Sequence, residues 1–168
     1  AIVMAINRLP AGGMHSIHKE IRSFARQLTD IRVRSSLLDY TFVNSASLIR
    51  AQASLLSHLG DQPKAFCTYS QGVAETTIVI SSGFEQLMED LFRAETLIDL
   101  SRHLSAVSLM LPATNRQLHG IYYYILKDLA WQGINVIELI STSNEFTIIV
   151  RDEDLDQTFS ILMNMRKV

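Results

Sequence analysis

The sequence predicts an α+β fold in which one order of elements, strand–helix–strand–strand–helix, occurs twice. Runs rich in β-branched and aromatic residues alternate with segments whose apolar residues follow helical spacing. The segment GVAETTIVI at 72–80 is echoed about seventy residues later by TSNEFTIIV at 142–150, with Glu75 and Glu145 in matching places. Gly60 and Gly133 each follow a predicted helix. The same order in both halves indicates an internal repeat.

The composition limits the class of protein. Of 168 residues, 48% are apolar and 19% charged, which is typical of a globular chain rather than a disordered one. The net charge of −2, with both signs mixed, disfavours a nucleic-acid surface. Cys67 is the single cysteine; we expect a buried structural thiol and a reducing, cytoplasmic setting. No apolar run approaches the ~20 residues of a membrane span.

Residues 1–30 are expected to form an N-terminal helical segment. Ala1–Leu9 is interpreted as the tail of a helix that ends at Pro10, and His15–Leu28 as an amphipathic helix with apolar residues at i, i+4, i+7 and i+11. Because the chain opens at Ala1 rather than at methionine, we expect sequence upstream to be missing. Contact with nucleic acid is expected only through such a missing N-terminal segment.

Each copy of the repeat has two predicted helices and several predicted strands. In the first copy these are strand 32–43, a helix capped by Asn44-Ser45 or Ser47 and running to Leu59, strands 64–69 and 75–80 around a turn at 70–72, helix 84–92 and a short extended piece at 96–100. In the second copy they are strand 104–111, loop 112–118, helix 120–131, strands 134–141 and 146–150, and helix 155–165.

These orders imply two ferredoxin-like βαββαβ units, at 31–101 and 102–168. The second unit ends too soon for a final strand, so one must come from the first unit or from another chain. One ferredoxin-like unit leaves sheet edges uncovered, and pairing of units or a homodimer would cover them.

The second unit resembles an ACT domain, a small-molecule-binding regulatory module, and more narrowly the tandem ACT region of aspartokinases. The resemblance rests on His119-Gly120-Ile121, Leu129-Ala130, Gly133-Ile134-Asn135-Val136 and Ser141-Thr142-Ser143 with Glu145. The first unit resembles the partner repeat more loosely, through Ser70-Gln71-Gly72 and Glu75-Thr76-Thr77-Ile78. No kinase half is present, because the chain holds no Gly-rich phosphate loop with its lysine. The first thirty residues resemble the end of a helix-turn-helix segment.

The resemblance implies an amino-acid site between the turn at Gly120 and the strand near Asn135 of a neighbouring unit. Glycine lets the backbone approach a ligand closely, and N–H groups at a helix start attract a carboxylate. Gly120 could equally serve only a tight turn, Asn135 a strand edge, and the serines their own turn. The candidate ligand-binding residues are His119, Gly120, Ile121, Asn135, Val136, Glu138, Ser141 and Ser143.

Two residues depart from the aspartokinase pattern. Ile137 precedes Glu138 where the family has an acidic residue directly, and Asn144 adds a residue before Glu145. Because strand side chains alternate, one inserted residue turns Glu138 to the other face of the sheet or forces a bulge.

Other clusters are better explained without a site. His15 and His18 have no third ligand at metal spacing, so no metal or other cofactor is expected. Tyr122, Tyr123 and Tyr124 point about 100° apart on a helix, which favours packing over base stacking. No nucleophile stands at recognisable spacing from a base, so we expect no enzyme and no catalytic residues. The sequence predicts a ligand-binding regulatory protein; the alternative is a ligand-free dimerisation module.

Overall fold

The computed structural model of the chain describes residues 23–24, 26–27, 30–60, 62, 65–112 and 119–166. The predictions for residues 1–22 and for most of the loop at 112–118 fall outside these residues.

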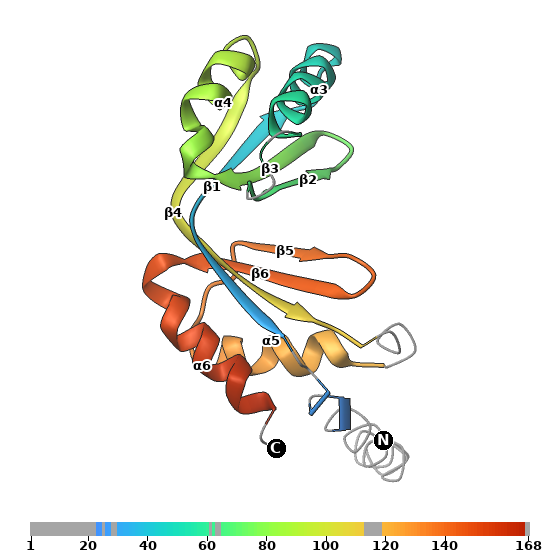
Figure 1. Cartoon of the computed structure of the whole chain (residues 1–168), viewed down its shortest axis with the longest axis vertical. Coiled ribbons are helices and arrows are strands. Elements are labelled where there is room, and N and C mark those ends of the chain that lie inside the picture. The colour runs from blue at the N-terminus through green and yellow to red at the C-terminus, as the bar shows by residue number, and fades with distance from the viewer. Residues whose placement is uncertain are drawn as a thin grey trace, which may run out of the picture. The chain divides into compact units, whose positions relative to one another are not determined.

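Four longer helices and six strands make up the described fold, in the order drawn in Figure 1. The first set is β1 (Ile31–Val43), α3 (Ala46–Leu59), β2 (Cys67–Gln71), β3 (Glu75–Ser81), a 3-10 turn η1 (Ser82–Phe84), α4 (Glu85–Phe92) and β4 (Leu97–Met110). The second set is α5 (Ile121–Trp131), β5 (Glu138–Ser141), β6 (Glu145–Arg151), a 3-10 turn η3 (Asp152–Asp154) and α6 (Leu155–Met165). The predicted α+β class is confirmed.

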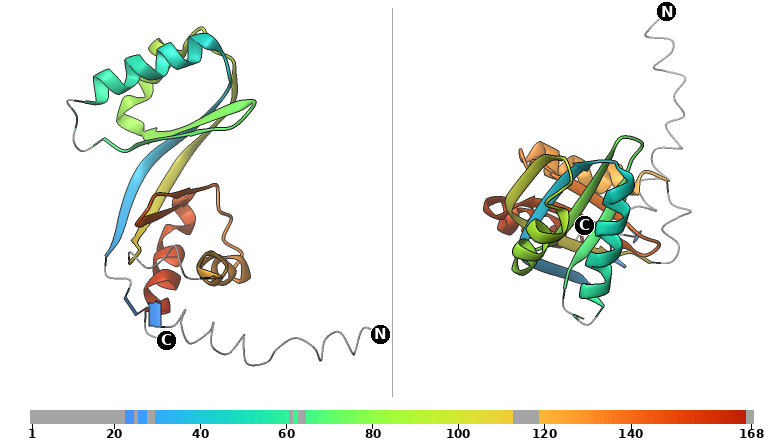
Figure 2. Two further views of the ribbon diagram at one scale, coloured as in Figure 1. Left: turned by 90° about the vertical axis from the view of Figure 1, so that its right-hand side faces the viewer. Right: turned by 90° about the horizontal axis from the view of Figure 1, so that it is seen from above.

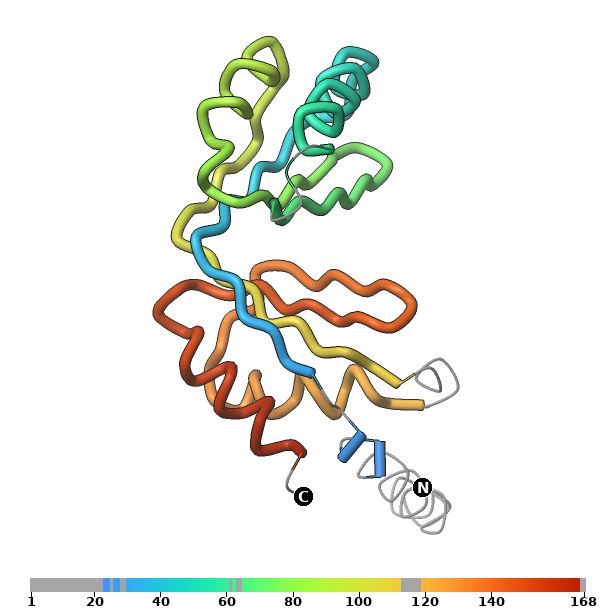
Figure 3. The backbone as a smooth tube through the Cα atoms, in the orientation of Figure 1, coloured from blue at the N-terminus to red at the C-terminus, as the bar shows by residue number. Residues whose placement is uncertain are grey.

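The strands form one sheet in the order β2-β3-β1-β4-β6-β5, and the pairs β1–β3, β2–β3 and β5–β6 are antiparallel. By packing, the chain divides into a first unit, Arg34–Ala106, and a second unit, Val107–Val168 with the described residues up to Val33. Both β1 and β4 are therefore shared between the units (Figure 3). The predicted spans 31–101 and 102–168 describe the repeat along the chain, whereas these units describe its packing.

The sequence-based break between an extended piece at 96–100 and a strand at 104–111 is wrong, because β4 runs without interruption from Leu97 to Met110. The polar residues Ser101 to His103 suggested a loop, but exposed polar side chains are compatible with a continuous strand. His103 has a positive φ of 58°, and Ser36, at the equivalent place in β1, has a φ of 60°. Such a left-handed residue within a strand is typical of a bulge.

The strand that the second unit lacks at its C-terminal end is supplied by the start of β1. The Met110 N–H donates to the Asp30 carbonyl at 3.0 Å, which places the first residues of β1 beside the last residues of β4. In the first unit, the Val43 N–H donates to the Thr96 carbonyl at 3.0 Å in the same way. Of the two sources that the sequence left open for the missing strand, the structure has the one within the chain.

Two further strand predictions need correction. β2 begins at Cys67 and continues through Gln71, so the turn predicted at 70–72 lies at 72–74 instead. β5 begins only at Glu138, not at Ile134. The Ile134 N–H donates to the Leu129 carbonyl at 3.0 Å, so this apolar residue still closes the helix rather than joining the ladder.

The internal repeat reappears in matching hydrogen bonds. The Gly72 N–H donates to the Glu75 carbonyl at 2.8 Å, and the Thr142 N–H donates to the Glu145 carbonyl at 2.9 Å. Two hydroxyl pairs also match, Thr41 with Thr77 at 3.1 Å and Ser108 with Thr147 at 2.6 Å. Hairpins of equal length in both units show that Asn144 fills the place of Ala74 and forces no bulge in this chain.

Each unit packs its helices against one face of its own strands, around its own core (Figure 2). The core of the first unit contains Leu38, Tyr40, Phe42, Leu48, Leu55, Ile78, Ile80, Met88 and Phe92. The core of the second unit contains Phe24, Val107, Leu109, Leu111, Ile121, Tyr124, Ile125, Leu129, Ile134, Phe146, Ile148, Val150, Leu162 and Met165. Cys67 is half-buried against the first core, and burial raises the pKa of its thiol.

Two searches of the described part of the chain gave no result. Its helices are too short or too polar to cross a membrane. Its His, Cys, Asp and Glu side chains gather nowhere in a group of three that could hold a metal ion.

Candidate functional site

The N-terminus of α5 carries the most specific sequence prediction, Gly120. Its φ is +80°, in the left-handed region that residues with a Cβ rarely adopt, so glycine is required for this turn. Among the described residues no side chain caps α5, although the first N–H groups of a helix have no partner within the helix. His119 is exposed beside this turn, whereas Ile121 is 3% exposed and belongs to the core.

The matching helix of the first unit is closed by its own residues. The Ser45 hydroxyl accepts from the Leu48 N–H at 2.9 Å and donates to Glu95 Oε2 at 2.6 Å. This side chain already satisfies a donor at the start of α3. An anion would therefore meet different conditions at the two equivalent helix starts, and only the second lacks a described cap.

The end of β5 lies next to the start of α5. The Tyr122 and Ser141 hydroxyls are 3.0 Å apart, and the Tyr122 ring centroid lies 5.0 Å from that of Phe146. Ser143 is exposed two residues further along, in the β5–β6 turn. The structure thus gathers five of the eight candidate residues around the α5 N-terminus: His119, Gly120, Ile121, Ser141 and Ser143.

The other three candidates lie near the opposite end of α5. Asn135 is exposed and Val136 half-buried in the segment between α5 and β5, and Glu138 opens β5. A helix of 11 residues such as α5 is about 16 Å long. Within one unit these three residues do not reach the Gly120 turn. One ligand could touch both groups only if they came from two different units or chains.

Glu138 points to the sheet face opposite the helices. It pairs with Ile149, whereas Ser141 pairs with Phe146, a residue of the helix-side core. Because strand side chains alternate, Glu138 and Ser141 face opposite sides. Burial raises the pKa of the Glu138 carboxyl group, and a hydrogen bond from the Leu139 peptide N–H partly offsets that shift.

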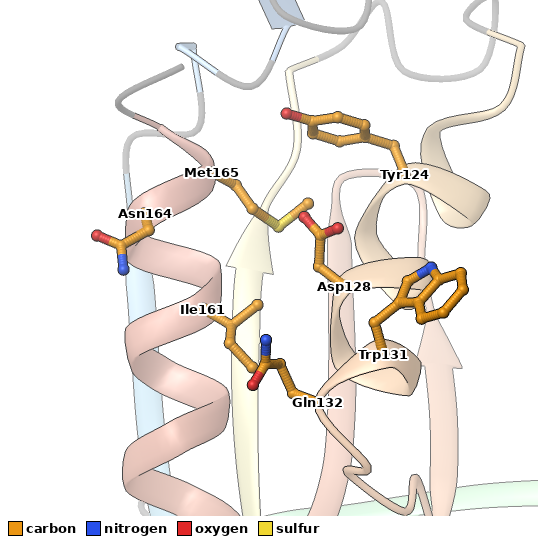
Figure 4. A pocket seen from close by; sticks show the side chains of 7 residues that line it. All are labelled: Tyr124, Asp128, Trp131, Gln132, Ile161, Asn164 and Met165. Carbon is orange, nitrogen blue, oxygen red and sulfur yellow. The ribbon is translucent and has the colours of Figure 1, made fainter.

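The structure also contains two cavities that the sequence analysis did not single out. One, of about 310 Å³, lies between α5 and α6 (Figure 4). The other, of about 260 Å³, lies in the first unit between α4 and the strands β1 and β4. Tyr40 lines this second cavity, and burial raises the pKa of its phenol to about 12. Spacing on α5 was the available signal for the first cavity, because Tyr124, Asp128 and Trp131 recur at i, i+4 and i+7.

The fold defines a class of protein. Neither a family model nor a curated protein sequence matches the chain. Among solved structures it is similar to the aspartokinase alpha and beta subunits, with a TM-score of 0.68, 12% identity, and coverage of 84% of this chain and 99% of that one. The chain therefore has the fold of aspartokinase regulatory domains, the ACT-type fold that the sequence resemblance implied.

Two other similar structures bracket the extent of the match. The ligand-free regulatory subunit of Thermus thermophilus aspartate kinase has a TM-score of 0.62 at 12% identity, covering 82% of this chain and 97% of that one. E. coli aspartokinase III in complex with lysine and aspartate has a TM-score of 0.61 at 13% identity. There the match covers 82% of this chain but 32% of the enzyme. The chain spans a regulatory subunit in full and about a third of a complete aspartokinase.

Proposed function

We propose that the chain is a non-catalytic regulatory protein that binds an amino acid through its second unit. The observation that carries the proposal is the difference between the two equivalent helix starts. α3 is closed by Ser45, whereas α5 begins at Gly120 with no described side-chain cap. Peptide N–H groups and the positive end of the helix dipole together attract a carboxylate.

In this proposal the ligand's carboxylate lies against the α5 N-terminus, with Gly120 allowing close approach of the backbone. Ser141 and Ser143 supply hydroxyl groups at the same end, and His119 lies at the entrance. Asn135, Val136 and Glu138 contribute from another unit, in this chain or in a second copy, because they lie too far away in their own. E. coli aspartokinase III, similar in its regulatory part, was solved with lysine and aspartate.

The proposed mechanism is linkage between ligand binding and the arrangement of units or subunits. A ligand that binds better to one arrangement raises its population and thereby changes an attached or partner domain. A coupling of about 1–3 kcal/mol, a typical allosteric value, would change a partner's affinity by roughly 5–150-fold. A cytoplasmic setting and a homodimer belong to the same proposal.

A thermal-shift screen against the twenty amino acids tests the proposal. A ligand at 100 times its Kd should add about 2.7 kcal/mol of stability. For a domain of this size that is an increase in Tm of roughly 5–10 °C. The absence of a shift with every amino acid, in a protein that stays folded, would refute amino-acid binding.

A second candidate function is dimerisation without a ligand. Ile49 and Leu56 are spaced seven residues apart on α3 and are 58% and 54% exposed. Ala53 lies between them on the same exposed stripe. Light scattering of the wild type and of an Ile49→Glu, Leu56→Glu variant tests this function. A dimer that the double variant breaks, together with no amino-acid response, would favour the dimerisation module.

A further inference from the structure

The groove between α5 and α6 has a chemistry different from that of the Gly120 turn. Tyr124, Asp128 and Trp131 form one side of it, on a single face of α5, and Ile161 and Met165 face them from α6 (Figure 4). The cavity of about 310 Å³ is large enough for a small organic molecule. Trp131 stands at its rim with 85% of its surface exposed, an unusual position for an indole.

The groove favours positive charge. Asp128 is the single charged residue among those that line it. The chain's own Lys127 ammonium lies 5.0 Å from the Tyr124 ring centroid and 4.0 Å from Asp128 Oδ1. A cation is thus already attracted to this pairing of aromatic ring and carboxylate. Aromatic faces beside a carboxylate are a general means of binding organic ammonium ions.

We propose that this groove binds a small organic amine with an apolar body. The ammonium group would pair with Asp128, and the body would lie against Tyr124, Met165 and the indole of Trp131. An α-amino acid fits less well, because its own carboxylate would approach Asp128. A metal ion is not the expected ligand, since one carboxylate with aromatic neighbours offers too few oxygen donors. The site is separate from that of the proposed function.

Trp131 is the only tryptophan of the sequence, so intrinsic fluorescence reports on this groove alone. We would titrate the full chain with 2-phenylethylamine and compare phenylalanine, which has the same body and an added carboxylate. The expected result is a saturable change with the amine and at least about fivefold weaker binding of the amino acid. Equal binding of the two, or no saturable change, would overturn the proposal.

Three variants locate the site. Asp128→Asn keeps the size of the side chain and should weaken amine binding at least about threefold, in the range of exposed charge pairs. The matched control Asp156→Asn, an exposed acid in the first turn of α6, should leave it unchanged. Lys127→Met removes the competing ammonium and should strengthen binding. Equal affinity for the amine in Asp128→Asn and wild type would refute the site.

The same titration separates this proposal from that of the amino-acid site. A Gly120→Ala variant should retain the amine-dependent fluorescence change, because Gly120 lies at the far end of α5. Loss of the amine response in this variant, with the fold retained, would mean that a single site produces both signals and would overturn a separate groove. An amino-acid response without an amine response would support the proposed function and reject the groove.

Discussion

Replacing Gly120 by alanine separates backbone strain from ligand binding, because Gly133 supplies a matched control. Gly120 and Gly133 have φ values of +80° and +74°, at the two ends of the same helix. An L-residue in the left-handed region costs about 1–2 kcal/mol. At Gly133 an added Cβ would meet no atom within 4 Å, so the cost there is strain alone.

Both variants should therefore lose about 1–2 kcal/mol of unfolding free energy, a decrease in Tm of roughly 2–8 °C for a chain of this size. Urea unfolding measures this loss without ligand. The ligand-induced stabilisation should fall only in Gly120→Ala. A tenfold loss of affinity would lower it by about 1.4 kcal/mol, from about 2.7 kcal/mol at 100 times the wild-type Kd.

The result that would refute this reasoning is specific. If Gly133→Ala loses as much ligand-induced stabilisation as Gly120→Ala, strain anywhere in the helix produces the effect. If Gly120→Ala keeps the full stabilisation, the ligand does not bind at the start of α5.

Three further predictions concern the surroundings of the site. Thr147→Val should cost about 1–3 kcal/mol by leaving the buried Ser108 hydroxyl without that bond, and adding Ser108→Ala should recover part of it in urea unfolding. Wild-type stability should fall as pH rises from 10 to 12, because Tyr40 ionises near pH 10 when unfolded and near pH 12 when folded. The full effect is up to about 2.7 kcal/mol and should disappear in Tyr40→Phe. Ser45→Ala should cost about 1 kcal/mol in urea unfolding with no change in amino-acid affinity; a change would place the ligand at α3 instead.

The helices were predictable because their signals are local. α3 has Ser45 as its N-cap and Gly60 as its C-cap, as expected from side-chain chemistry alone. α6 begins at Leu155, directly after the predicted acidic residue Asp154. Capping and apolar periodicity depend on residues within one or two turns, so a single sequence contains them.

The course of β4 was not predictable from local pattern. A strand that leaves one unit and enters another is not buried in the same way along its length, so its apolar alternation is interrupted. The positive φ at His103 adds a bulge for which the sequence gives no glycine signal. The groove between α5 and α6 was missed for a related reason. Its α5 side could be read from spacing, but Met165 lies more than thirty residues away along the chain.

The candidate site was predictable in part. Gly120 adopts the conformation that only glycine takes easily, and Ser141 lies beside the first turn of α5. The sequence could not show that Asn135 and Glu138 lie at the other end of the same helix. That separation follows from the length of α5 and from the late start of β5.

The two units have diverged at the positions that hold the hairpin turn. In the first unit, Asn44 Nδ2 donates to the Gly72 carbonyl at 2.9 Å, and the Thr76 hydroxyl donates to Asn44 Oδ1 at 2.6 Å. The equivalent residues of the second unit are Leu111 and Phe146, whose side chains have no hydrogen-bonding groups.

The main-chain bond that accompanies them is nevertheless kept. The Leu111 N–H donates to the Asn144 carbonyl at 2.7 Å, as the Asn44 N–H does to Ala74 at 2.8 Å. The first unit therefore satisfies with its own side chains both the start of its helix and its turn. The second unit keeps the same backbone geometry but leaves these polar positions to other groups. A repeat that retains the scaffold and loses its internal partners is the unit in which a ligand can supply them, and this places the proposed binding at Gly120 rather than at Ser45.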